Sequence, residues 1–238
     1  DQDGLAIKRI RSGVSRYRRS EVDGMTPEEF ERSAEQVRPH WDVTPLDGVG
    51  PLRFGMTVEE VAAALPDARE LRRFQADPTF AEVVGVELGW QPTVPALYGY
   101  FLGSGQLFCV AADAVHGPLM SLDGTQLTGR NPAELDRWLF DLSDSMGGSL
   151  RYGPRANPGI EELGLVLRAQ NTTEGVLSRP VLVGREWAER CVDDWEGVIP
   201  ECEWVGRLWP DPRYSDRREV WPFAEDSPTW YGKWSPPF

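Results

Sequence analysis

The chain has 238 residues and a formal net charge of −13. This length accommodates one sizeable hydrophobic core with appendages, and two small domains would also fit. Ten Trp residues and an aromatic fraction of 11% argue against wholesale disorder. An acidic protein repels nucleic acid and anionic membranes, so we expect neither of them as a partner. We expect a basic protein as the partner instead. The alternative is that the acidity only keeps the protein soluble.

The cysteine and hydropathy patterns predict a protein of the reduced cytoplasm. Cys109, Cys191 and Cys202 are an odd number with no C-x-x-C spacing, which argues against a disulfide framework. No run approaches the roughly 20 apolar residues of a membrane span. Because the sequence does not begin with Met, the question whether a signal segment precedes it is left open.

The N-terminal region is predicted to be a basic helical arm. Residues 1–20 carry six basic and two acidic side chains. Within 5–19, apolar residues recur at helical spacings of three and four (Ile7, Ile10, Val14 and Tyr17). We expect this arm to fold back onto the acidic body. A second helix is predicted after the cap residue Thr26, and 41–50 is interpreted as a Pro/Gly linker, so that 1–44 forms the arm.

A strong helix-start signal lies in Pro51–Leu65. Thr57 is the predicted N-cap, and Glu60, three residues later, completes a capping box. The apolar positions that follow are spaced to share one helical face: Val58, Val61, Ala62 and Leu65.

The same pattern recurs at 127–142. Asn131 takes the place of Thr57, Pro132 follows at the first helical position, and Gly129 aligns with Gly55. Two related strand-turn-helix units packed on one sheet are therefore predicted. Four apolar residues of the two helices should be buried: Val61, Leu65, Leu135 and Leu139.

The rest of the chain predicts an α+β fold with a mostly antiparallel sheet. Alternating or apolar runs predict strands at 84–90, 97–102, 106–112, 119–122, 163–167, 181–183 and 204–209, and residues 184–196 suggest a further helix. The core domain is predicted to span 45–210. Residues 211–238, rich in Trp and Pro without any period, are interpreted as an extended tail that wraps the core.

Few residues suggest catalytic chemistry. His40 and His116 are the two histidines, and no motif around any Ser indicates a nucleophile. Cys109 lies in an apolar run, where a buried structural thiol is a more common role than pairing with His116. No metal-ligand spacing is present. We expect no cofactor, no metal site and no enzyme activity, although 38 acidic residues leave a carboxylate-dependent hydrolase as an alternative.

The strongest binding pattern lies in 186–204, where seven carboxylates interleave with Trp. Aromatic anchors inside a charged rim are typical of protein interfaces. The predicted partner-binding residues are Trp187, Asp193, Asp194, Trp195, Glu196, Glu201, Glu203 and Trp204. The alternative is that the Trp side chains face the core and the acids form their solvated side.

The unit G-M-T-x-E-E-V-x-x-x-L at 55–65 resembles the strand-turn-helix opening of several small bacterial proteins. These include small outer-membrane assembly lipoproteins, the β-lactamase inhibitor protein and polymorphic-toxin immunity proteins. Together with SLDGTQLTGRNPAELDRWL at 121–139, it is most similar to immunity-like proteins, over about 50–142. The resemblance implies a small α+β domain that binds another protein and has no catalytic residues.

The leading hypothesis is a cytoplasmic immunity protein that neutralises a cognate basic toxin. A structural protein that assembles through its arm and tail is a further alternative, and the oligomeric state is open.

Overall fold

The computed structural model describes residues 5–10, 13–18, 38–77, 82–91, 93–153, 156–172, 175–193, 198–200 and 203, the first two ranges by their backbone. The predicted α+β class is confirmed, because antiparallel strands dominate and two α-helices pack on them. Helix α3 spans Val58–Ala64 and helix α4 spans Pro132–Met146. In the described part of the chain, no helix is both long and apolar enough to span a membrane.

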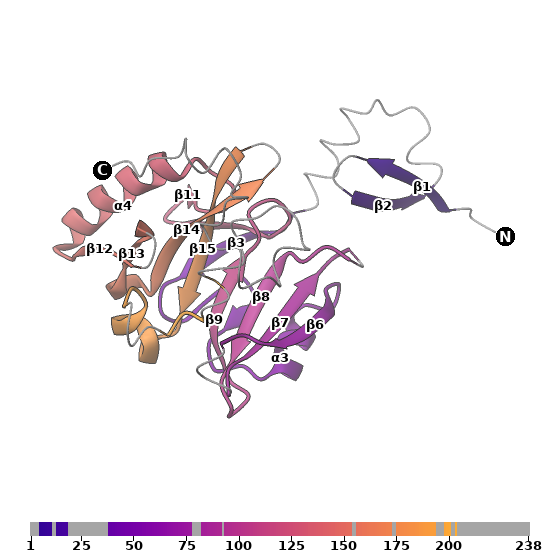
Figure 1. The fold of residues 1–238 in the computed structure, drawn as a ribbon, viewed down its shortest axis with the longest axis horizontal. Coiled ribbons are helices and arrows are strands. Elements are labelled where there is room, and N and C mark those ends of the chain that lie inside the picture. Colours follow the sequence, from indigo (N-terminus) through magenta and orange to yellow (C-terminus); the bar gives the residue numbers. More distant parts are fainter. Residues whose placement is uncertain are drawn as a thin grey trace, which may run out of the picture.

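An eight-stranded antiparallel sheet forms the centre of the molecule (Figure 1). Its strands, from one edge to the other, are β12 (Leu150–Tyr152), β13 (Pro158–Ile160), β14 (Leu165–Thr172), β15 (Gly175–Val183), β9 (Leu107–Ala112), β8 (Leu97–Phe101), β7 (Val84–Gly89) and β6 (Arg69–Gln75). The predicted hairpin around Gly103–Gly105 is confirmed as β8 and β9. The polar segment that became β6 was not predicted as a strand.

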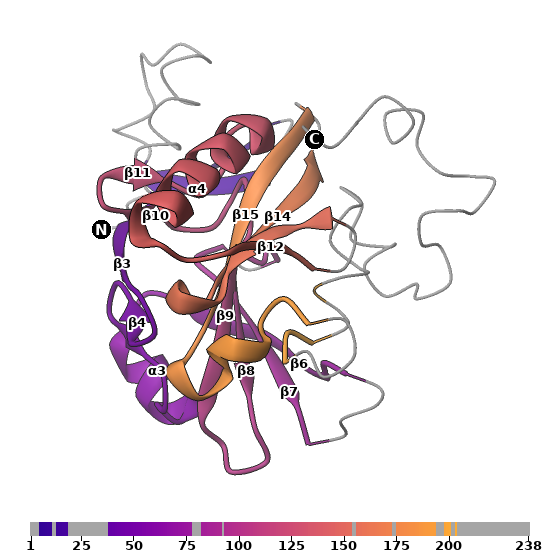
Figure 2. The ribbon, with the colours of Figure 1, turned by 90° about the vertical axis from the view of Figure 1, so that its left-hand side faces the viewer.

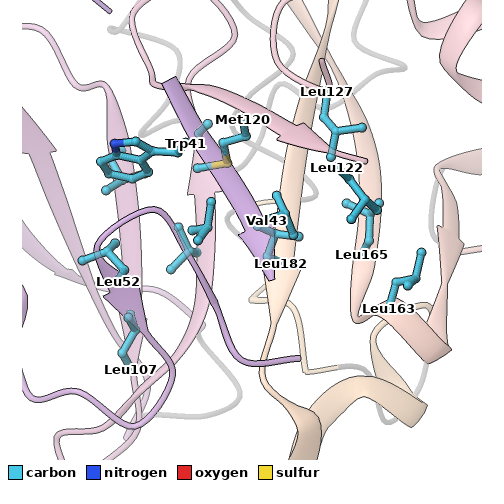
Figure 3. Close-up of a cluster of buried hydrophobic side chains, with 14 of the residues drawn as sticks. Trp41, Val43, Leu52, Leu107, Met120, Leu122, Leu127, Leu163, Leu165 and Leu182 are labelled. Carbon is cyan, nitrogen blue, oxygen red and sulfur yellow. The ribbon is translucent and has the colours of Figure 1, made fainter. Parts of the chain in front are cut away.

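A smaller five-stranded sheet lies on one face of the large sheet together with α3 and α4 (Figure 2). Its order is β11 (Thr125–Gln126), β10 (Leu119–Leu122), β3 (His40–Thr44), β4 (Gly48–Val49) and β5 (Leu52–Arg53). Figure 3 shows Val43 of β3 beside Leu182 of the large sheet, in the main hydrophobic core to which Trp41 also belongs. We call this covered side the first face.

The two halves of the described core repeat the same order of elements. Residues 40–112 run from short strands through α3 into the four-stranded meander β6 to β9. Residues 119–183 run from short strands through α4 into the meander β12 to β15. The last strands of the two meanders pair with each other and join both halves into one sheet.

The turn before each helix docks on the large sheet in the same way, which supports the predicted repeat. Gly55 N donates to Leu107 O at 2.8 Å, and Leu107 N donates to Met56 O at 2.8 Å. The equivalent bonds in the second half join Gly129 N to Ser178 O at 2.9 Å, and Ser178 N to the carbonyl that follows Gly129 at 2.8 Å. Both glycines have a positive φ, +91° and +73°.

The predicted helix starts are confirmed. Thr57 caps α3, with the capping box to Glu60, and the Asn131 side chain caps α4 by accepting from Ala133 N. All four apolar residues predicted to be buried are at most 6% exposed: Val61, Leu65, Leu135 and Leu139. Their side chains belong to the same core cluster, so both helices pack on one sheet.

Two expectations for the N-terminal part are wrong. The predicted helix over 5–19 is a hairpin of β1 (Leu5–Ile10) and β2 (Gly13–Arg18). The residues of this region favour strands, because three of its apolar residues are β-branched and Gly13 disfavours helix. The predicted linker over 41–50 contains β3 and β4 instead, since β3 finds a parallel partner in the distant β10.

Other expectations are only partly covered by the described residues. The helix predicted over 184–196 is a short 3-10 helix, η3, at Arg185–Arg190. Strand β3 lies before the domain boundary placed at residue 45, and the division into 1–44, 45–210 and 211–238 stays a prediction. The helix after Thr26, the strand at 204–209 and the wrapping tail lie outside the described residues.

The opposite side of the large sheet, here called the second face, carries its own apolar cluster. Val181 and Val183 belong to it, whereas Leu182 between them belongs to the first face, as expected for a strand. Residues that follow η3 cover this cluster: Cys191, Val192 and Ile199. The second face is thus also buried, and it contains the polar groups described next.

Candidate functional site: buried arginines on the second face and an acidic face on helix α4

The structure describes three of the eight residues predicted to bind a partner. Trp187 is half-buried, with its ring centroid 5.7 Å from that of Phe108 and the Arg190 guanidinium 5.2 Å above it. Asp193 is also half-buried. Trp187 therefore packs partly inward, as the alternative interpretation held. The assignment of Asp194, Trp195, Glu196, Glu201 and Trp204 stays a prediction outside the described residues.

Glu203, the third of these residues, is an interior group. Its side chain has no exposed surface and forms an ion pair with Arg179, which is equally buried. Arg179 Nη2 donates to both carboxylate oxygens at 2.8 Å, and Arg179 Nε donates to Oε2 at 3.1 Å. Tyr100 donates its hydroxyl proton to Oε1. Here Glu203 binds the sheet rather than forming part of a surface rim.

A second arginine lies next to this pair. Arg168 on β14 is directly opposite Arg179 on β15 in the antiparallel register, and it is 1% exposed. Its Nη1 atom is 3.9 Å from Glu203 Oε2. Like charges directly opposite each other destabilise a strand pair, and burial in a medium of low dielectric increases their repulsion. The carboxylate beside both guanidinium groups offsets that repulsion.

Arg179 is also positioned by groups on two other strands of the large sheet. Its guanidinium lies 4.6 Å from the centroid of the Tyr98 ring on β8, a cation–π geometry. Its Nη1 donates to Gln170 Oε1 at 3.3 Å. Gln170 is in turn fixed by Ala114 N, which donates to its Oε1 at 3.1 Å, and by Asp113 Oδ2, which accepts from its Nε2 at 2.7 Å. The second face therefore holds a connected polar network.

The outer face of α4 is the second candidate site, and it is a surface. Phe140 is 61% exposed, while Leu135 and Leu139 on the inner side are buried. Asp136 and Asp144 lie one helical turn before and after Phe140, and Asp141 is exposed beside it. We call Asp136, Phe140, Asp141, Asp144 and Tyr152 the acidic aromatic face.

Tyr152 extends this face from β12. Its side chain is 42% exposed, and its hydroxyl donates to Asp136 Oδ1 at 3.1 Å. Partial burial raises the pKa of Asp136, although the hydrogen bond from Tyr152 opposes this. The pKa of Tyr152 is raised by burial and by the neighbouring Asp136 charge. The pair links the helix to the sheet edge and places a second aromatic ring beside the carboxylates.

Of the residues considered for catalysis, His40 begins β3 and His116 lies in the turn between β9 and β10. Cys109 is fully buried in β9, which confirms its interpretation as an interior thiol. Burial, aided by the nearby Glu161 charge, raises the pKa of Cys191 to about 12. Among the described residues, no group of three or more His, Cys, Asp or Glu lies close enough together to bind a metal ion.

Comparison with protein-family models, curated proteins and solved structures yields no match. The function is therefore inferred from the geometry of the chain itself.

The sequence interpretation included Glu203 but missed Arg168, Gln170 and Phe140. Arg168 and Gln170 interrupt the apolar run of β14 at alternate positions, a pattern that places two polar side chains on one buried face. Phe140 falls outside the apolar stripe of α4, so the helical pattern alone marks it as exposed. Both signals are visible in the sequence once the elements are assigned.

Proposed function

We propose that the protein is an immunity-type binding protein, which neutralises a cognate basic bacterial toxin in the cytoplasm by forming a protein–protein complex. The observation that carries the proposal is the acidic aromatic face of α4. Interfaces combine buried aromatic anchors with a polar rim, and Phe140 beside Asp141 and Asp144 has this composition. The net charge of −13 favours a basic partner in the same way.

The energetic argument concerns Phe140. A Phe side chain that moves from water into an interface contributes about 1.5–3 kcal/mol. At 61% exposure, most of that contribution is still available to a partner. Carboxylates around such an anchor steer a cationic protein toward it, and they make the association rate depend on ionic strength.

Trp187 and Asp193 offer a second contact region that belongs to the same proposal. Both side chains are half-buried, so part of each remains accessible. The resemblance of 50–142 to immunity-like proteins supports the functional class, and it does not identify the contact face.

The experiment is a binding measurement between the full chain and the toxin-like product of a neighbouring gene, at low and high ionic strength. A complex that weakens with salt is expected. Phe140→Ala and Asp144→Lys should each weaken it by about tenfold or more. The matched controls are Val84→Ala, at another exposed apolar residue, and Asp67→Lys, at an exposed acid beyond α3.

Asp144→Lys should not reduce the stability of the protein, so a loss of binding can be assigned to the contact face. The residue lies in the last turn of α4, where a positive charge interacts favourably with the helix dipole, so the variant should fold normally. The absence of any salt-sensitive complex with such gene products would contradict the proposed function. Equal weakening by the controls would contradict the assignment of the face.

A further inference from the structure

We propose that the centre of the second face is a carboxylate-binding site, built by Arg168, Arg179 and Tyr100, which the chain fills with its own Glu203. The proposal is independent of the toxin-binding function. It concerns the ligand that these residues recognise, namely a carboxylate carried at the end of a side chain. In the resting protein, that carboxylate belongs to the segment after η3.

The receptor side of the site is held in place by contacts that do not involve Glu203. Arg179 stacks on Tyr98 at 4.6 Å and donates to Gln170 at 3.3 Å. The position of Gln170 is fixed by a backbone N–H donor and by Asp113. A guanidinium held in this way presents its remaining donors in a fixed fork, which is the arrangement that binds a carboxylate through two parallel hydrogen bonds.

The charges of the receptor select an anion. Arg168 and Arg179 are cross-strand neighbours with exposed fractions of 1% and 0%. Charge-assisted hydrogen bonds to a carboxylate are about twice as strong as neutral ones. A neutral amide of the same shape would accept hydrogen bonds without offsetting the repulsion between the two guanidinium groups. The ligand class is therefore a carboxylate rather than an amide.

Receptor and ligand come from separate parts of the chain. Arg168 and Arg179 lie on the adjacent strands β14 and β15, and Tyr100 lies on β8. Glu203 is 24 residues after Arg179 and 103 residues after Tyr100. The site thus behaves as a receptor on the sheet with an intramolecular ligand, so removal of the ligand side chain should leave a receptor that accepts a free carboxylate.

The test is chemical rescue of Glu203→Ala in the full chain. This substitution removes a carboxymethyl group, whose free counterpart is acetate. We expect a lower midpoint of thermal unfolding than in the wild type, and a saturable rise of that midpoint with acetate at constant ionic strength. Acetamide, the neutral analogue, should give no such rise. Glu189→Ala, at an exposed acid of η3, is the matched control and should behave as the wild type in all solutions.

Three outcomes would overturn the proposal. They are an unfolding midpoint of Glu203→Ala equal to that of the wild type, a destabilised variant that acetate does not rescue, and equal acetate shifts in all three proteins.

If Glu203→Ala does not fold, Glu203→Gln provides a second test, because it keeps the shape and removes the charge. Cys191 is fully buried in the apolar cluster of the second face, so its labelling by a maleimide, read by peptide mass spectrometry, reports opening of that face. We expect labelling about tenfold faster than in the wild type and in Glu189→Gln. Equal labelling rates in the three proteins would contradict the proposed site.

Discussion

The repeated glycines before the two helices permit a matched prediction about the fold. Gly55 and Gly129 occupy equivalent turns, and both have a positive φ that an L-residue adopts at a cost of about 1–2 kcal/mol. A Cβ added at Gly55 would meet no atom within 4 Å. A Cβ added at Gly129 would lie 2.9 Å from the carbonyl oxygen of Ala114, so the backbone there would have to shift.

The two substitutions should therefore differ in magnitude. Gly55→Ala carries only the conformational strain, partly offset by the lower entropy of the unfolded chain, and should reduce the free energy of unfolding by about 1 kcal/mol. Gly129→Ala adds the steric overlap and should cost about 2–4 kcal/mol.

Urea denaturation measures both values, provided that the slope of the transition is unchanged. Gly55→Asn is a useful control, because Asn tolerates positive φ better than Ala and should be the milder substitution. An equal loss in the free energy of unfolding at the two glycines would contradict the steric difference between the turns. No loss at either glycine would contradict the role of positive φ in both turns.

Three further predictions concern the core, the second face and the acidic aromatic face. Leu139→Ala should lower the free energy of unfolding by about 2–5 kcal/mol in urea titrations, because the side chain is fully buried between α4 and the sheet; a loss under about 1 kcal/mol would contradict its place in the core. Cys191 should resist alkylation at pH 8 in the native wild type, since a pKa of about 12 leaves about one thiolate in ten thousand, and a rate close to that of a free thiol would contradict its burial. Asp136→Asn should become more stable relative to the wild type as pH rises through the carboxyl pKa. A raised folded-state pKa makes ionisation of Asp136 destabilising above that pKa and without effect at low pH; a difference that is independent of pH in denaturation curves would argue against it.

Local signals in the sequence were sufficient to predict helices α3 and α4 and to show that they belong to two repeated units. Thr57 with Glu60, and Asn131 with a following Pro, are short-range capping patterns whose energetics do not depend on the rest of the fold. The apolar spacing then identified the buried residues Val61, Leu65, Leu135 and Leu139, although Ala62, assigned to the same face, is exposed. The topological repeat follows from the same two units, because each is followed by a four-stranded antiparallel meander.

The features that the sequence interpretation missed depend on distant partners. Trp41 and Val43 alternate over only five residues, and their strand forms because β10, far along the chain, pairs with it in parallel. The polar strand β6 is an edge strand that pairs with β7, and Phe74 packs against the cluster of the second face. Arg179 is buried because Glu203 and Tyr98 both contact its guanidinium. These two residues lie far from Arg179 in the sequence, so no local pattern predicts the contacts.

The most direct test of the proposed function is neutralisation in cells. A toxin domain encoded beside this gene would be expressed with the wild-type chain, with Phe140→Ala/Asp144→Lys, or alone, at matched protein levels. The wild-type chain should restore growth, and the double variant should restore it far less, because it lacks both the aromatic anchor and one steering charge. Failure of the wild-type chain to protect against any such neighbouring toxin would contradict the proposal that this is an immunity-type protein.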